Sequence, residues 1–118
     1  MKLAKMPESV DVSQVVQRAP VGIEPDGAGR FTRPLPGTLL LTREELVVVS
    51  GPEEAPEVVM RQGRNDLAMI RRPTPRGGER VELAAMDGQH ATLRFTRTEV
   101  GSAGMLAAWL AGLPLATG

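Results

Sequence analysis

The chain has 118 residues, in which 14 Lys and Arg residues balance 14 Asp and Glu residues. This length fits one domain that buries roughly 65% of its unfolded surface. The balanced charge gives no overall attraction to nucleic acid or to an anionic membrane. The sequence contains no cysteine, which excludes disulfides, thiolate metal ligands and cysteine nucleophiles.

The N-terminal segment, residues 1–29, is expected to lie outside the main domain. Val12, Val15 and Val16 are spaced as on a helix, which predicts a short helix within residues 9–18. Residues 20–29 are rich in turn formers and predict a loop. No apolar stretch of signal-peptide length follows the first lysines, and none reaches the ~20 residues of a membrane span. We therefore expect a cytoplasmic protein, peripheral to a membrane at most.

The next part of the chain, residues 30–113, predicts an antiparallel β domain. Strand-like runs recur about every 8 to 13 residues, too closely for the crossover helices of a parallel sheet. The predicted strands are residues 30–33, 38–42, 46–50, 57–61, 67–71, 80–86 and 91–97. The fold class is therefore mainly β, a seven-stranded antiparallel, partly open barrel or sandwich, and residues 114–118 form a tail.

The clearest hairpin joins residues 80–86 to residues 91–97. Val81, Leu83 and Ala85 alternate with polar or small residues, and so do Ala91, Leu93 and Phe95. Asp87-Gly88 between them favours a turn with left-handed backbone conformations.

A C-terminal amphipathic helix is expected to cover the sheet. The runs 39–41 and 46–49 are apolar on both faces, so they need cover. Met105, Leu106, Trp109, Leu110 and Leu113 form one apolar stripe, with Ser102 as a possible cap and Pro114 beyond the end. The predicted core residues are Leu39, Leu41, Val47, Val49, Leu83, Leu93, Phe95, Leu106, Trp109 and Leu110.

This order of elements resembles the pleckstrin-homology-like superfold, including GRAM and bacterial PH-like domains. The stretch 37–50, with its glycine, strand, Thr-led turn and second strand, is similar to the early strands of that family. Asp87-Gly88 with Leu93-Arg94-Phe95 is similar to its last hairpin, and residues 105–110 to its capping helix. The resemblance implies a partly open barrel plugged by the helix, which serves as a platform for lipid headgroups or peptides. In phosphoinositide-binding members the first loop is basic, whereas residues 34–37, taken as that loop, carry no charge.

Catalytic interpretations rest on few residues. Asp87 could orient His90, the only histidine, but no activated nucleophile accompanies them, and a solvated turn is favoured. The pairs Glu44-Glu45 and Glu53-Glu54 would point apart on a strand or turn. The glycines of residues 101–104 open the helix without a Walker lysine, which favours a hinge over a phosphate loop. We expect no enzyme activity, no metal site and no cofactor.

The remaining polar candidate is an arginine-rich stretch in which Arg71, Arg72, Arg76 and Arg80 could bind anions. The alternative is a solvated loop paired to Asp66 and Glu79. Few aromatic residues are available for base stacking, so nucleic acid is not an expected partner. The expected function is a non-catalytic module that binds a protein partner or a second copy of itself. Binding of anionic lipid or phosphate groups through the arginines is the alternative.

Overall fold

A computed structural model describes residues 12–25, 33–51 and 56–112. It contains one sheet of seven antiparallel strands in the order β4-β3-β2-β1-β7-β6-β5, and the sheet is not closed. The strands are β1 (Gln17–Ile23), β2 (Leu35–Leu41), β3 (Glu45–Ser50), β4 (Glu57–Gly63), β5 (Leu67–Pro73), β6 (Glu79–Ala85) and β7 (His90–Phe95). Short 3₁₀ turns are η1 (Val12–Gln14), η2 (Arg64–Asp66) and η3 (Arg97–Glu99), and the helix α1 is Val100–Leu110.

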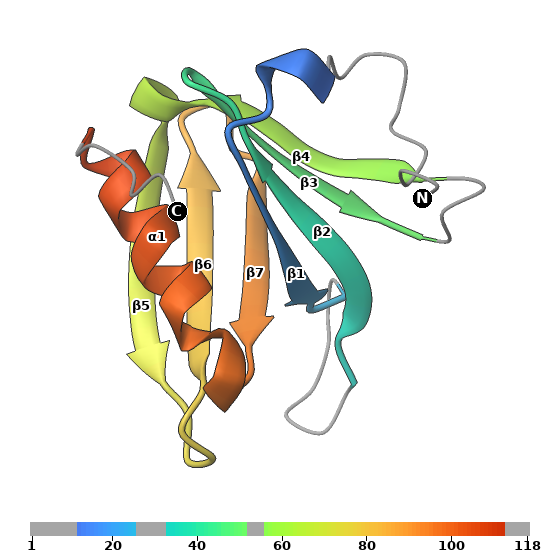
Figure 1. Ribbon diagram of the computed structural model, residues 1–118, viewed down its shortest axis with the longest axis vertical. Coiled ribbons are helices and arrows are strands. Elements are labelled where there is room, and N and C mark those ends of the chain that lie inside the picture. Colours follow the sequence, from blue (N-terminus) through green and yellow to red (C-terminus); the bar gives the residue numbers. More distant parts are fainter. Residues whose placement is uncertain (1–11, 26–32, 52–55, 113–118) are drawn as a thin grey trace.

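The sheet curves so that its two halves face different directions, with α1 crossing in front of β5 and β6 (Figure 1). Successive strands pair as antiparallel neighbours within each half, and β1 joins the halves by pairing with β7 only at Gly22 and Ile23. The mainly β class and the single C-terminal helix are confirmed. In the described part of the chain, no helix is long and apolar enough to cross a membrane.

The first strand is the main difference from the sequence-based expectation. Residues 20–23 belong to β1, where a loop was predicted, so the sheet begins inside the N-terminal segment. Ala19, Val21 and Ile23 are buried in alternation, but Pro20 and Gly22 between them disguise the strand pattern. Of the predicted helix 9–18, residues 9–11 lie outside the described residues, residues 12–14 form η1, and residues 17 and 18 belong to β1 instead. The predicted strand 30–33 falls largely outside the described residues, and Arg33 is not in a strand.

The other predicted strands lie close to β2 through β7. The hairpin of β6 and β7 is confirmed, with Val81 opposite Leu93 and Gly88 at a φ of 93°. Residues 35–37, expected in a loop, are part of β2. The connection between β1 and β2 therefore spans residues 24–34 and includes Arg33. The stretch 34–37 is not this loop, so its lack of charge is no argument against a basic first loop.

The main core lies between the sheet and α1. From the helix, Ala103, Leu106 and Trp109 are buried, and the inward residues of the strands complete the core. Of the predicted core residues, Leu39, Leu41, Leu83, Leu93 and Phe95 also lie here, and Leu110 is partly buried against it.

A second, smaller cluster lies on the outer face of β2 and β3. Leu40, Val47 and Val49 are buried there, with Val15 and Val58 packed against them. The two apolar runs are thus buried on both faces, as expected, although α1 covers only the inner face.

The helix begins at Val100 rather than near Ser102. The 3₁₀ turn η3 leads directly into it and begins with a capping box, in which the Thr96 side chain and the Glu99 carboxylate each satisfy the other residue's backbone N–H. The expected apolar stripe packs against the core from Met105 to Leu110, while Leu113 lies outside the described residues, and no residue of α1 is charged. The side opposite the core carries small residues, among them Gly101, Gly104 and Ala108.

Candidate interaction surface

The β5 edge is the backbone side of β5 that faces away from β6. No described strand pairs with it, because β5 is the last strand in the sheet order. Two backbone hydrogen bonds set the phase of the β5–β6 ladder: Thr74 N donates to Gly78 O, and Met86 N donates to Asp66 O, both at 3.0 Å. Hydrogen-bonded and non-hydrogen-bonded pairs alternate in antiparallel ladders. These two bonds therefore determine which residues of β5 bond to β6 and which direct their backbone groups toward the open edge.

This phase directs the backbone groups of Leu67, Met69, Arg71 and Pro73 toward the open side. Proline has no N–H, so Pro73 fits this register without losing a bond to β6. The β5 edge therefore offers three amide donors in a row, together with the neighbouring carbonyl acceptors. The ladder with β6 runs from Leu67–Ala85 to Pro73–Glu79 without a register shift.

The opposite sheet edge, β4, is less regular. The pairing of β3 with β4 shifts register between Val48 and Val49, which is the signature of a bulge. Arg61 on β4 also forms a bidentate pair with Glu45, at 2.9 and 3.2 Å. Bulges protect sheet edges against pairing, so β5, whose ladder with β6 has no register shift, is the more regular of the two edges.

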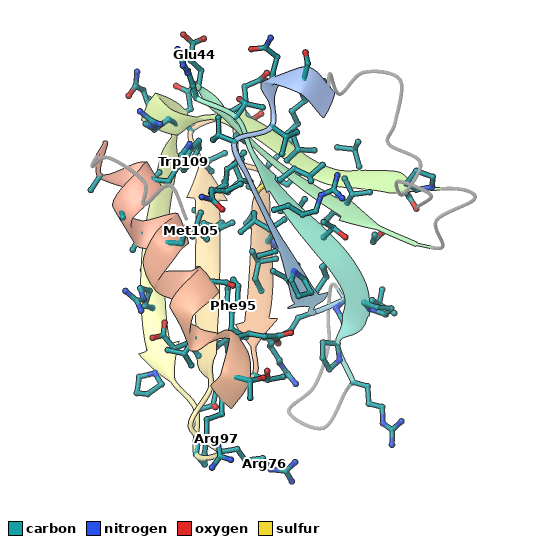
Figure 2. The ribbon with its side chains drawn as sticks, in the orientation of Figure 1. Glu44, Arg76, Phe95, Arg97, Met105 and Trp109 are labelled. Carbon is teal, nitrogen blue, oxygen red and sulfur yellow. The ribbon has the colours of Figure 1, made fainter. Side chains whose placement is uncertain are left out.

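Side chains on the two faces of β5 differ in character. Leu67 and Met69 are partly buried against the core on the side of α1, where Met105 also packs. Figure 2 shows Met105 at the side of the helix that faces the sheet. On the outer face, Ile70 is 52% exposed, which is unusual for a large aliphatic side chain on a charged face. A strand added at the β5 edge would therefore meet apolar side chains on both faces.

Of the four arginines named from the sequence, two are held by carboxylates. Arg71 forms a bidentate pair with Glu79, at 2.6 and 2.7 Å. Arg80 contacts Glu24 at 2.6 Å and Glu82 at 3.0 Å. The hydrogen bond from Arg71 lowers the pKa of Glu79, while partial burial opposes this effect. These two arginines are parts of internal ion pairs rather than free anion ligands.

Glu24 is the carboxylate on which the outer-face ion pairs converge. Its side chain is only 9% exposed and accepts from Arg80 and, at 3.2 Å, from Arg94. Burial raises the pKa of Glu24, but the hydrogen bonds from Arg80 and Arg94 outweigh it and leave the pKa below its ordinary value. Because Arg80 lies on β6 and Arg94 on β7, their pairs with Glu24 connect the end of β1 with both strands.

The other two arginines are exposed, and Arg76 gains a neighbour that the sequence did not indicate. Arg72 is 64% exposed and approaches Glu82 only at 4.0 Å. Arg76 lies in the β5–β6 turn, where the side chain of Arg97 packs beside Gly77. Figure 2 shows Arg76 and Arg97 together at one end of the molecule, with Glu44 at the other. We call Arg76 and Arg97 the arginine cluster.

The carboxylate of Asp87 accepts hydrogen bonds from two glutamine residues. It accepts from the backbone N–H of Gln89 and from Nε2 of Gln62, both at 2.9 Å. The hydrogen bond from Gln89, supported by that from Gln62, lowers the pKa of Asp87. His90 is exposed at the start of β7. Within the residues that the structure describes, no group of three or more potential metal-ligating side chains occurs.

Comparisons with known proteins bear on the fold. No family model matches the sequence, and no curated protein matches it. Among solved structures, the chain is similar to the C-terminal domain of an unknown protein from Leishmania infantum, with a TM-score of 0.60 and 12% identity over 82% of this chain and 84% of that chain. At this identity the likeness concerns the fold alone. The open seven-stranded sheet with its C-terminal helix is consistent with a PH-like fold.

Proposed function

We propose that this protein is a non-catalytic, PH-like interaction module that binds an extended segment of a protein partner at the β5 edge. The observation that carries the proposal is the row of outward backbone groups at Leu67, Met69 and Arg71. An added strand gains main-chain hydrogen bonds from such a row and gains specificity from alternate side chains. The module would act in the cytoplasm.

The flanking side chains support this function. Ile70 is exposed on the outer face, while Leu67 and Met69 lie only partly buried on the face that α1 covers. An added strand would shield these groups from water, and apolar burial contributes about 25 cal/mol per Å². The ladder of β5 with β6 has no register shift, so β5 presents an unbroken template for this pairing.

Replacing Met69 tests the proposal. The N–H of Met69 faces the open edge, so Met69→Pro removes an outward donor without breaking a bond to β6. Met69→Leu keeps the N–H and a side chain of similar volume and serves as the matched control. We expect full-length wild type and Met69→Leu to retain the same partner from a lysate of the source cell, and Met69→Pro to lose it. Equal retention by a folded Met69→Pro variant would contradict strand addition at β5.

A second candidate function is binding of anionic lipid headgroups by the arginine cluster. It is favoured by the meeting of Arg76 and Arg97 at one end of the molecule (Figure 2). Salt-sensitive binding to phosphatidylserine vesicles should then fall in an Arg76→Glu, Arg97→Glu variant. Each single variant, Arg76→Glu or Arg97→Glu, should also bind less than Arg43→Glu, the charge-matched control in the turn at the other end of the molecule. Vesicle binding that is equal in all variants would exclude this site.

A further inference from the structure

We infer that the segment bound at the β5 edge is β5 of a second copy of this chain, paired antiparallel about a two-fold axis at Met69. The inference rests on the proposed function and names its partner. Antiparallel pairing of a strand with itself satisfies the same backbone groups in both copies and gives a closed, isologous interface. Met69 would face Met69 of the second copy, and Leu67 would face Arg71.

Charge complementarity favours this register. Position 72 of one copy then lies opposite position 66 of the other, which brings Arg72 beside Asp66 at both ends of the interface. Arg72 is largely exposed and holds Glu82 only loosely, at 4.0 Å. Asp66 is exposed at the end of η2, and no ion pair to it is found among the described residues. Opposite charges that face each other across strands stabilise the pairing, and like charges destabilise it.

Shifting the axis by one residue is unfavourable in either direction. An axis at Ile70 would place Pro73 opposite Leu67, where a backbone donor is needed and proline has none. An axis at Ala68 would place Arg72 opposite position 64 and so lose its pairing with Asp66. The axis at Met69 avoids both problems and also packs Ile70 of each copy beside Ala68 of the other on the outer face. Both of these side chains are exposed in the single chain.

The helix is compatible with this arrangement. Pairing about such an axis keeps the inner faces of both sheets on the same side, so the two α1 helices would flank the axis. Figure 1 shows α1 in front of β5. Its outer side carries Gly101, Gly104 and Ala108, and positions next to Gly101 and Gly104 are open space. Small, uncharged residues here let two helices approach without burying charge.

Exchanging the two charges tests the register on the full chain. By light scattering across a concentration series, wild type should reach twice the 12.6 kDa mass of one chain. Arg72→Asp and Asp66→Arg each create like-charged pairs and should raise the dimer dissociation constant roughly tenfold or more. An equimolar mixture of these two variants restores opposite charges at both ends and should form a heterodimer with near wild-type affinity. Both substitutions lie on exposed side chains, so folding is expected to be preserved.

The outcomes separate this inference from the proposed function. A wild type that stays monomeric, or a mixture that fails to recover the dimer, would overturn pairing with a second copy. If that monomer still captured another protein in a manner lost with Met69→Pro, strand addition at β5 would stand. A dimer that is unchanged in Met69→Pro would contradict self-pairing at β5, whereas partner capture that is unchanged in Met69→Pro would contradict strand addition at β5.

Discussion

The indole nitrogen of Trp109 donates a hydrogen bond of 2.7 Å to the backbone carbonyl of Thr42. This bond ties α1 to the turn between β2 and β3 and satisfies the only polar atom of a fully buried indole ring. The guanidinium of Arg64 lies over the same ring, with Cζ 4.9 Å from its centroid. One aromatic side chain thus links the helix to both halves of the sheet.

Replacing Trp109 should strongly destabilise the protein. We expect Trp109→Ala to lower the free energy of unfolding by about 3–5 kcal/mol because it leaves a large cavity. Trp109→Phe should cost less, about 1–2 kcal/mol, since it removes the hydrogen bond and part of the burial. Urea unfolding followed by circular dichroism measures both. Met86→Ala, at a side chain that is 83% exposed, is the control and should change little.

Removing the cation above the ring should have a smaller effect. Arg64→Met keeps much of the apolar stem but loses the charge over Trp109, and should cost about 0.5–1 kcal/mol. In a Trp109→Phe background the same substitution should cost less, because the cation then faces a weaker aromatic partner. Trp109 is the only tryptophan, so urea unfolding followed by circular dichroism, which needs no tryptophan, measures the change in both backgrounds. An equal cost in both backgrounds would show that Arg64 acts independently of the ring.

Two glycines should respond to alanine with opposite signs. A methyl group at Gly78 would collide with the carbonyl oxygen of Phe95, whereas one at Gly104 would meet open space. Gly78→Ala is therefore expected to destabilise by about 1–3 kcal/mol, as overpacking does. Gly104→Ala should stabilise the monomer by about 0.5–1 kcal/mol through helix propensity. Thermal unfolding at low protein concentration checks the pair, and a shared sign would contradict the local packing.

The Glu24 ion pairs predict a pH dependence of stability. Because the pKa of Glu24 in the folded chain lies below its ordinary value of 4.5, the carboxylate stabilises the fold above that pH. Its contribution is lost as the pH falls through the lowered pKa. Glu24→Gln should therefore be less stable than wild type at pH 7, and the difference should shrink below pH 4.5. A difference that stays constant through the acid range would show that Glu24 does not act through its charge.

Local patterns account for most of what the sequence could predict. The hairpin of β6 and β7 follows from strict alternation and one Asp-Gly turn. The predicted Thr-led turn is also present, since the Thr42 hydroxyl accepts from the backbone N–H of Glu45 at 2.9 Å. Each of these features depends on residues that are close together in the chain.

The rest depends on contacts between distant parts of the chain. β1 was missed because Pro20 and Gly22 are poor strand formers, and pairing with β2 overrides their preference. The arginine cluster includes Arg97 only because the β5–β6 turn packs against the residues after β7. The partners of Arg71 and Arg80, and the phase of the β5 edge, likewise follow from strand pairing that no local pattern encodes.

Backbone amide hydrogen exchange along β5, followed by NMR, tests the central claim most directly. In dilute protein, the amides of Leu67, Met69 and Arg71 should exchange much faster than those of Ala68, Ile70 and Arg72, which donate to β6. At concentrations where the chain associates, the first three should become protected while the others change little. Similar protection of all six in dilute protein, or fast exchange at Met69 in the associated state, would contradict strand addition at the β5 edge.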